Sequence, residues 1–558
     1  VGTYALNFST ASNNVAVGDV ASYKNTSGSQ NVAVGYQASY LNQTSGLNTA
    51  VGYQALYNNI ANYNTAFGHQ AGKAITSGTE NLALGRASMR DSAGVTGNSN
   101  TGLGNFTLNS LTSGGSNVAI GPAALNNVDS GNQNIAIGNN AGTLISSASN
   151  NVAIGHQALA SSTTGNGLNV AIGYQTLNAQ TTGSLSVGVG AFALHANTYS
   201  GNVAVGYAAL EENVAGAANI AVGFKTLENN VSGNYNVGMG FTALQDTTGS
   251  NNVAIGHQAM LESQGGGTNI AIGSNALYQN SSGSGNVAIG SGEGGVSVGA
   301  LGANTTGTKN TAVGALSLIT NGSGIENTAI GYQALTLANS NYNTAIGAKA
   351  AQATNTGHVT AIGSYTLFAN TSGTRNVAVG GADGSGASMG SNQTGNDNVA
   401  VGYHSLQTNV SGGVNVALGT YALYNNLTSS NVGIGFQSGF TTSTGTQNTL
   451  VGTYAGYGNT TASGNTYMGN QAGYASLGGY NTFLGHDTGR YMTSGNYNTV
   501  VGRFSGNQNG LNLTTRSNHV VLSDGAGNRR FHAAEKGTNI YARKDNRAGG
   551  WSFGANIV

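Results

Sequence analysis

Four histidines are the residues of this sequence best suited to bind a metal ion or to move a proton, since imidazole does both near neutral pH. They are His69, His156, His257 and His486. Each follows directly after the glycine of a repeated motif. Other copies of the motif carry an aromatic residue at that place, as at Tyr36, Tyr53, Tyr174, Tyr207, Phe224 and Tyr332. We therefore interpret the four histidines as members of a row of rings, and the sequence predicts no metal site and no cofactor.

Phosphate, calcium and catalytic sites are not indicated either. Two glycine-rich stretches, Gly292–Gly295 and Gly380–Gly386, lack the Lys-Ser/Thr that follows a phosphate-binding loop. Asp383 in GGADGSG is similar to part of a calcium-binding β-roll repeat, but it occurs once and a shared row of calcium ions needs many copies. Acidic residues are too sparse to name the carboxylate pair of a glycan-cleaving enzyme. We expect no enzymatic activity.

Two groups of side chains remain as candidates for contact with a ligand. The row of rings, each followed by a polar residue that is often Gln, could bind sugars, because aromatic faces pack on pyranose rings and amides bond hydroxyl groups. Rings stacked on successive turns also simply stabilise a fold, and we favour that role. Near the C-terminal end, the candidates for contact with a cell-surface glycan or protein receptor are Arg529, Tyr541, Arg543, Trp551 and Phe553. Trp551 has the alternative role of closing the end of the fold.

The element that must position all these residues is a short repeat. The sequence NTAVGYQAL at Asn48–Leu56 returns as NVAIGHQAL at Asn151–Leu159, NVAIGYQTL at Asn169–Leu177 and NTAIGYQAL at Asn327–Leu335. Successive glycines of the motif are usually 16 or 17 residues apart. Self-similarity at a short fixed period is typical of a stacked solenoid.

Each copy predicts one coil of a parallel β-solenoid. The residues before the glycine alternate between β-branched residues and alanine, which is typical of a short strand. The residues after the glycine predict a second short strand or a corner, and the Asn, Thr, Ser and Gly that follow predict turns. We therefore expect an all-β fold with about 30 coils of 16–17 residues over 1–506, and a small β-rich cap or tip over 507–558.

Two positions recur so strictly that they predict structural rows. Asparagine stands four residues before the glycine in every regular copy except at Ser186 and Val359. Stacked asparagines lie one strand spacing apart, so each amide can donate to the next. The glycine indicates positive φ or a lack of room for Cβ. Representative members of the two rows are Asn31, Asn48, Asn64, Asn151, Asn169, Asn327, Gly35, Gly52, Gly68, Gly155, Gly173 and Gly331.

Composition supports an ordered and self-associating chain. The 558 residues include 91 Gly, one Pro and no Cys, with only 6% charged residues and a formal net charge of zero, which fits neither a disordered chain nor a polyanion-binding protein. The sequence contains no run of about 18 apolar residues, so it predicts no membrane span. The few large apolar side chains of one coil do not offset the entropy of ordering it. We therefore expect a homotrimer, in which the alanine of each strand faces the neighbouring chains.

Departures from the repeat give local predictions. In the copies at Gly452, Gly469, Gly485 and Gly502 the strand alanine becomes larger while the later leucine becomes glycine, so we expect these two positions to share space. We expect loops or bulges within 290–314 and 380–402, where the period lengthens. The tail predicts a hairpin with an Asp-Gly turn over His519–His532, then strands at Asn539–Arg543 and Trp551–Val558.

The repeat also resembles known families. The N-x-A-[VI]-G core, as in Asn31–Gly35, resembles the head repeats of trimeric autotransporter adhesins, whose heads are left-handed parallel β-rolls of three chains. The longer NTAVGYQAL form is similar to shaft repeats of bacteriophage tail fibres, and SDGAGNRRF at Ser523–Phe531 resembles a motif found near the ends of such fibres. The resemblance covers about 1–506 for the repeat and about 517–534 for the tail. It implies a left-handed, homotrimeric β-roll on a virion tail or another extracellular surface.

The predicted function is that of a structural and adhesive fibre, namely the shaft and distal region of a phage tail fibre that attaches to a host cell. The alternative is a bacterial surface adhesin or an extracellular filament subunit. An ice-binding solenoid is a weaker fit, because Thr49, Thr65 and Thr311 alternate with valine where a regular threonine array is needed. A polysaccharide-degrading tailspike lacks its acidic pair. The chain begins inside a coil, at Val1-Gly2, so we expect an upstream part of the same or another fibre protein as a further partner.

Overall fold

The computed structural model describes residues 2–162, 167–292, 298–382 and 386–534. They fall into two compact units, Val1–Ile272 and Gly273–Val558. Within the described residues the regular elements are strands and turns, and there is no helix. The predicted all-β class is confirmed.

Strands of three residues follow one another through both units. The first unit contains β1 (Val15–Val17), β2 (Val32–Val34), β3 (Thr49–Val51), β4 (Thr65–Phe67), β5 (Leu82–Leu84), β6 (Thr101–Leu103), β7 (Val118–Ile120), β8 (Ile135–Ile137), β9 (Val152–Ile154), β10 (Val170–Ile172), β11 (Val187–Val189), β12 (Val203–Val205), β13 (Ile220–Val222), β14 (Val237–Met239), β15 (Val253–Ile255) and β16 (Ile270–Ile272). The second unit continues with β17 (Val287–Ile289), β18 (Thr311–Val313), β19 (Thr328–Ile330), β20 (Thr344–Ile346), β21 (Thr360–Ile362), β22 (Val377–Val379), β23 (Val399–Val401), β24 (Val416–Leu418), β25 (Val432–Ile434), β26 (Thr449–Val451), β27 (Thr466–Met468), β28 (Thr482–Leu484) and β29 (Thr499–Val501). Four strands of other lengths end it: β30 (Asn507–Gln508), β31 (Leu511–Asn512), β32 (His519–Ser523) and β33 (Arg529–Ala534).

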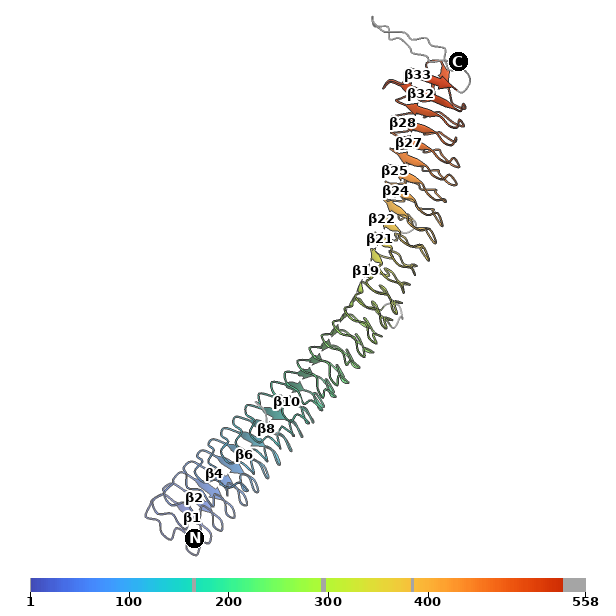
Figure 1. Cartoon of the computed structure of the whole chain (residues 1–558). Coiled ribbons are helices and arrows are strands. Elements are labelled where there is room, and N and C mark those ends of the chain that lie inside the picture. The colour runs from blue at the N-terminus through green and yellow to red at the C-terminus, as the bar shows by residue number, and fades with distance from the viewer. Residues whose placement is uncertain (1, 163–166, 293–297, 383–385, 535–558) are drawn as a thin grey trace. The chain divides into compact units, whose positions relative to one another are not determined.

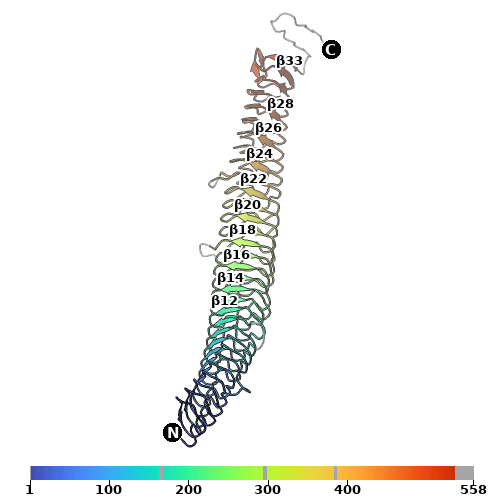
Figure 2. The ribbon, with the colours of Figure 1, turned by 90° about the vertical axis from the view of Figure 1, so that its left-hand side faces the viewer.

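Consecutive three-residue strands of each unit pair in parallel without slippage. Val15 lies opposite Val32 in the first unit, and Thr311 lies opposite Thr328 in the second. Within each unit the strands therefore lie side by side in chain order, one per coil (Figures 1 and 2). The predicted parallel β-solenoid is confirmed, with about 29 coils that carry a three-residue strand.

The residues that follow the glycine form a corner, so the alternative of a second strand is wrong. They are turn residues, and two of them in each typical coil adopt left-handed backbone angles, such as Gln54 (φ 51°) and Leu56 (φ 50°). Such angles are unfavourable for residues with a Cβ. The cost is offset because the Leu56 side chain is buried and its N–H donates to the carbonyl of Ala71 in the next coil at 3.0 Å.

The core of each coil is built from the strand alanine and the corner residues. Ala50, Ala55 and Leu56 are fully buried, whereas the β-branched residues on either side of Ala50 are partly exposed. The prediction that this alanine faces neighbouring chains is therefore wrong. The reason is that the cross-section of the coil is narrow. In β25 the place of the strand alanine is taken by Gly433, and an added Cβ there would lie 2.7 Å from Leu423 Cγ.

The place of the strand alanine (the strand slot) and the place of the corner leucine (the corner slot) were predicted to exchange side-chain volume. This exchange is confirmed in three coils. A Cβ added to Gly473 would lie 2.5 Å from the Tyr467 ring, and one added to Gly489 would lie 2.5 Å from the Phe483 ring. A Cβ added to Gly456 would likewise lie 2.8 Å from Leu450 Cδ2. Gly506 differs, because its space is taken by Met492 and not by Val500.

Two early coils have glycine at the corner but keep alanine in the strand. The space above Gly72 is filled by Leu56 and Ile75, and that above Gly142 by Leu125 and Ile145. Ile75 and Ile145 stand seven residues after the repeat glycine of their coil. The position seven residues after the repeat glycine is therefore a third core slot that takes part in the exchange of side-chain volume.

The asparagines before the glycines form one buried row in each unit. Asn48 Oδ1 accepts the backbone N–H of Asn64 at 2.9 Å, and Asn310 Oδ1 accepts that of Asn327 at 3.0 Å. Asn64 Nδ2 donates to the carbonyl of Gly78 at 2.8 Å. Backbone N–H groups are thus the main donors along the row. Amide-to-amide bonds, such as Asn151 Nδ2 to Asn134 Oδ1 at 3.0 Å, accompany them in part of the coils.

The repeat glycine meets both of its expected constraints at Gly52. Its φ is 139°, and an added Cβ would lie 2.2 Å from the carbonyl oxygen of Gly68. Residues with side chains rarely adopt that backbone angle, and the next coil leaves no space for one.

The two long spacings do not interrupt the stack. Val287 of β17 lies opposite Thr311 of β18, and Val377 of β22 lies opposite Val399 of β23, so the flanking strands stay paired across the additional residues. This agrees with the predicted insertions. Their central parts, 293–297 and 383–385, lie outside the described residues, and Asp383 is among them.

The stack continues after the repeat motif is lost. β32 pairs in parallel with β29, Val520 opposite Thr499, and antiparallel with β33. The hairpin predicted with an Asp-Gly turn is confirmed: Asp524 Oδ1 accepts the backbone N–H groups of Ala526 at 3.0 Å and Asn528 at 2.8 Å. The strands expected at 539–543 and 551–558 lie outside the described residues.

Candidate binding surfaces

The row of rings after the glycine is stacked and exposed. Tyr53 stacks between Tyr36 and His69 at ring-centroid distances of 5.4 and 5.0 Å. His156 and His257 stack in the same way, on Tyr174 and Phe241 respectively. Within such a run the aromatic faces are covered by neighbouring rings and mainly the edges meet solvent. The geometry favours the stabilising role over sugar binding, because a pyranose needs an open aromatic face.

The glutamines beside these rings satisfy one another. Gln54 Nε2 donates to Gln37 Oε1 at 2.8 Å, and Gln70 Nε2 donates to Gln54 Oε1 at 3.0 Å. Their amides are therefore engaged within the fold. This arrangement also argues against the sugar-binding alternative for the row.

A second row of rings lies five residues after the glycine and was missed by the sequence reasoning. Tyr40 stacks between Tyr23 and Tyr57 at 5.5 and 5.1 Å. A longer run in the second unit comprises Tyr424, Phe440, Tyr457 and Tyr474. The signal was available as a tyrosine or phenylalanine at that offset in neighbouring copies.

The outer face of the parallel sheet is apolar and exposed. The position directly before the glycine carries large apolar side chains that are more than one third exposed, for example Ile255 and Ile272. In the first unit the others are Val17, Phe67, Leu84, Leu103, Ile137, Ile172, Val205 and Met239. In the second unit they are Ile330, Ile346, Ile362, Val401, Met468 and Val501. We call this row the outer apolar row.

Two histidines of the terminal hairpin form a buried pair. His519 Nδ1 lies 2.8 Å from His532 Nε2, and the two rings stack at 5.0 Å. Burial, followed by the charges of His519, Arg529 and Arg516, lowers the pKa of His532 to about 4. Burial and Arg516 also lower the pKa of His519. Both rings are therefore neutral at pH 7 and share one hydrogen bond.

Among the predicted contact residues, the structure describes only Arg529. It is half-buried at the start of β33, opposite Ser523. Tyr541, Arg543, Trp551 and Phe553 lie outside the described residues. The contact set therefore stays a prediction.

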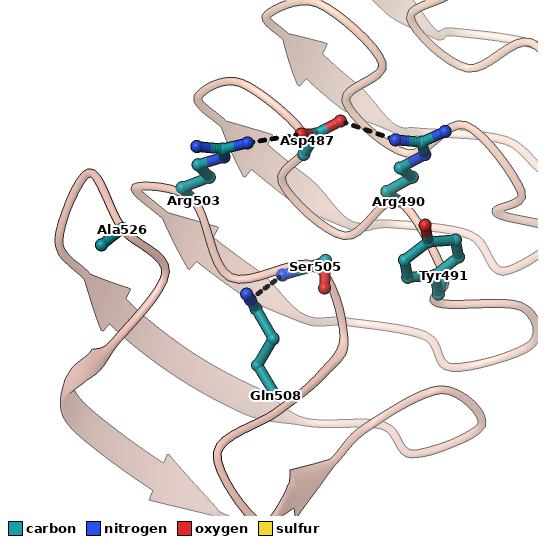
Figure 3. Close-up of a pocket in the computed structure, with 7 residues that line it drawn as sticks. All are labelled: Asp487, Arg490, Tyr491, Arg503, Ser505, Gln508 and Ala526. Carbon is teal, nitrogen blue, oxygen red and sulfur yellow. Dashed lines mark hydrogen bonds and ion pairs between the residues drawn. The ribbon is translucent and has the colours of Figure 1, made fainter.

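A polar pocket in the last coils was also missed (Figure 3). Its volume is about 310 Å³, and it is lined by Asp487, Arg490, Tyr491, Arg503, Ser505, Gln508 and Ala526. Asp487 Oδ1 pairs with Arg490 Nη1 at 3.2 Å, and Asp487 Oδ2 pairs with Arg503 Nη2 at 3.3 Å. His486, which occupies a slot of the ring row, also contacts Asp487, with Nδ1 2.9 Å from Oδ2. His486 thus has a different role from the other three histidines.

Other site classes find little support in the described part of the chain. No group of three or more His, Cys, Asp or Glu side chains gathers there in a way that could hold a metal ion. None of the described residues forms a helix with the length and apolarity needed to cross a membrane. Comparison of the chain with protein-family models, curated proteins and solved structures finds no match. The outer apolar row and the polar pocket are therefore the two candidate interaction surfaces of the described residues.

Proposed function

We propose that this chain is one protomer of a homotrimeric adhesive fibre, and specifically the shaft and distal region of a phage tail fibre that attaches to a host cell surface. The observation that carries the proposal is the outer apolar row. Monomeric soluble proteins rarely expose continuous apolar surface, and long exposed rows of this kind mark interaction sites.

Other copies of the same chain are the partners that fit this row. Its side chains stand at the same position of successive coils, as at Ile255 and Ile272 on the paired strands β15 and β16. A partner that matches an apolar side chain at every coil must have the same period, which another copy has by construction. Closed cyclic association of identical chains is also common among soluble homo-oligomers. The likeness to three-chain β-rolls supports three copies and a left-handed coil.

The adhesive role is supported by the difference between the surface along the coils and the surface near the C-terminal end. Stacked rings and amide rows satisfy the side chains along the coils, whereas the polar pocket near the C-terminal end offers charged groups to solvent. Repetitive coils that end in a region with a different surface suit a fibre that carries a recognition site near one end of the chain.

The test of assembly compares the full chain with a charged variant. The protomer mass is 55.6 kDa, and light scattering on the purified chain is expected to give three times that value. Ile255→Lys with Ile272→Lys places two charges in the outer apolar row and is expected to give the monomer mass. Ser232→Lys with Gln264→Lys, at exposed positions outside the row, is the matched control and is expected to keep the trimer.

Two results would contradict the proposal. A measured monomer mass for the full chain at micromolar concentration would contradict the proposed trimeric state. Fluorescently labelled trimer that binds no bacterial cells across a broad strain panel would remove the adhesive role.

A further inference from the structure

The pocket replaces repeat residues with charged ones. Asp487 stands two residues after its glycine, where Gln54 and Gln70 stand in their own coils, and Arg503 stands directly after its glycine, where Tyr53 stands. Charged residues make up only 6% of the chain. His486, Asp487, Arg490 and Arg503 thus place four ionisable residues on two adjacent coils.

Asp487 holds the two guanidinium groups in place without satisfying them. Each guanidinium has five N–H donors, and each is paired with Asp487 through one nitrogen. Arg490 Nε is buried without a hydrogen-bond partner among the residues that the structure describes. The Arg490 guanidinium also packs on the Tyr491 ring, 5.4 Å from its centroid. The donors are thus preorganised for an acceptor that the described residues do not supply.

The local charge is positive by one unit when His486 is neutral. Arg490 and Arg503 carry two positive charges, and Asp487 carries one negative charge. The nearby Asp524 pairs with Arg530 at 2.7 Å and is not a residue that lines the pocket. A single additional anionic group would balance the site.

The remaining walls are suited to a sugar. Tyr491 is about half exposed, at 51%, and offers its ring at the edge of the pocket. Gln508 Oε1 accepts the backbone N–H of Ser505 at 2.9 Å, which fixes the amide and leaves its Nε2 as a donor. Figure 3 shows the two arginines on either side of Asp487, with Tyr491 beside Arg490 and Gln508 beside Ser505. A volume of about 310 Å³ is at the lower end of the range for small-molecule sites, as a monosaccharide requires.

We propose that this pocket binds a carboxylated sugar unit of a cell-surface glycan, a hexuronate or a related sugar acid. The ligand carboxylate accepts hydrogen bonds from Arg490 and Arg503, a geometry for which guanidinium is well matched. Tyr491 packs on the sugar ring, and Gln508 donates to a hydroxyl group. A monoanion balances the single surplus charge, whereas a phosphate dianion exceeds it. The inference rests on the adhesive function proposed above and names the chemistry of its receptor.

The experiment measures binding of glucuronate to the full chain by ligand-observed saturation-transfer NMR, with glucose as the neutral control. Glucuronate is expected to bind and glucose to bind at least tenfold more weakly. Arg503→Gln, which removes the charge but keeps a polar side chain, and Tyr491→Ala are each expected to weaken glucuronate binding at least tenfold. Arg375→Gln, which removes a guanidinium paired with Asp397 far along the chain from the pocket, is the matched control and is expected to change nothing.

Three results would overturn the assignment. They are equal binding of glucose and glucuronate, unchanged binding in both pocket variants, and complete displacement of glucuronate by equimolar inorganic phosphate. Cell binding by the same variants separates this proposal from the wider one. If Arg503→Gln loses glucuronate but cell attachment persists, the adhesive function stands and the pocket is not its receptor site. If wild-type protein binds glucuronate but no cells, the pocket assignment stands and the adhesive function fails.

Discussion

At the scale of single residues, one asparagine per coil joins each turn of the solenoid to the next. Its Oδ1 accepts the backbone N–H of the equivalent residue one coil further on, as from Asn48 to Asn64. Val359 interrupts this row: its own N–H still donates to Asn343 Oδ1 at 3.1 Å, but its side chain has no acceptor to offer to Asn376. Val359 is buried, so water cannot easily replace the missing bond.

Val359→Asn is therefore expected to stabilise the coils around it. The new Oδ1 lies where it can accept the Asn376 N–H, which adds about 1 kcal/mol of net hydrogen-bond free energy. That gain corresponds to about fivefold slower hydrogen exchange in a peptide that contains Asn376, measured by mass spectrometry at fixed pH. The reverse change, Asn327→Val, is expected to speed exchange at Asn343 by a similar factor. Unchanged exchange in both variants would show that the row carries no stability.

The residue scale also shows where sequence reasoning is strong. Strictly repeated positions such as the asparagine and the glycine could be identified because their surroundings are the same in every coil and therefore require the same residue. The pocket could not be identified in this way. Asp487, Arg503 and Gln508 each depart from the repeat individually, and their proximity depends on how the last coils fold over one another.

At the scale of the element, the coil is a narrow ring whose core slots share one volume. Tyr467 and Phe483 fit because Gly473 and Gly489 make room for them, and Gly72 is filled from a third slot by Ile75. The period and the strand positions were predictable. The side of the strand that faces inwards was not, because a three-residue strand with alanine between two β-branched residues presents apolar groups on both faces.

The terminal hairpin is the element with a built-in pH dependence. In the folded hairpin the pKa of His532 is about 4 and that of His519 is lowered, whereas an unfolded histidine has a pKa of about 6.5. Between these values the unfolded hairpin binds more protons than the folded one. Stability is therefore fully present above about pH 6.5 and is lost as the pH falls towards 4.

We expect the hairpin to lose up to about 2 kcal/mol of local stability over that range, measured as faster hydrogen exchange at β32 and β33 after correction for the intrinsic rate. His532→Phe keeps a ring against His519 and is expected to reduce the pH dependence. His257→Phe, in the row of rings of the first unit, is the control and is expected to leave it intact. The pKa of Asp524 is lowered to about 2, chiefly by hydrogen bonds from Asn528, so its contribution is lost mainly below about pH 4 and overlaps this range only at its acid end. A flat profile from pH 6.5 to 4 in the wild type would contradict the assignment.

At the scale of the whole molecule, the chain carries two surfaces that respond to different forces. The outer apolar row is formed by Val, Ile, Leu, Met and Phe side chains, and the formal net charge of the chain is zero. The proposed association through that row would be driven by the removal of apolar surface from water. The pocket instead depends on partly exposed charges, such as Arg503, whose side chain is 48% exposed. Salt should therefore separate the two surfaces.

Raising sodium chloride from about 0.1 M to about 1 M shortens the Debye length from about 10 Å to about 3 Å. Apolar association is not weakened by this screening, so the trimer mass from light scattering is expected to stay constant. Glucuronate binding, measured by NMR in the same two buffers, is expected to weaken several-fold because the attraction between its carboxylate and the two guanidinium groups is screened. Dissociation of the trimer at high salt would mean that charged groups outside the outer apolar row hold the copies together. Salt-independent glucuronate binding would mean that stacking on Tyr491, and not the arginine pair, provides the affinity.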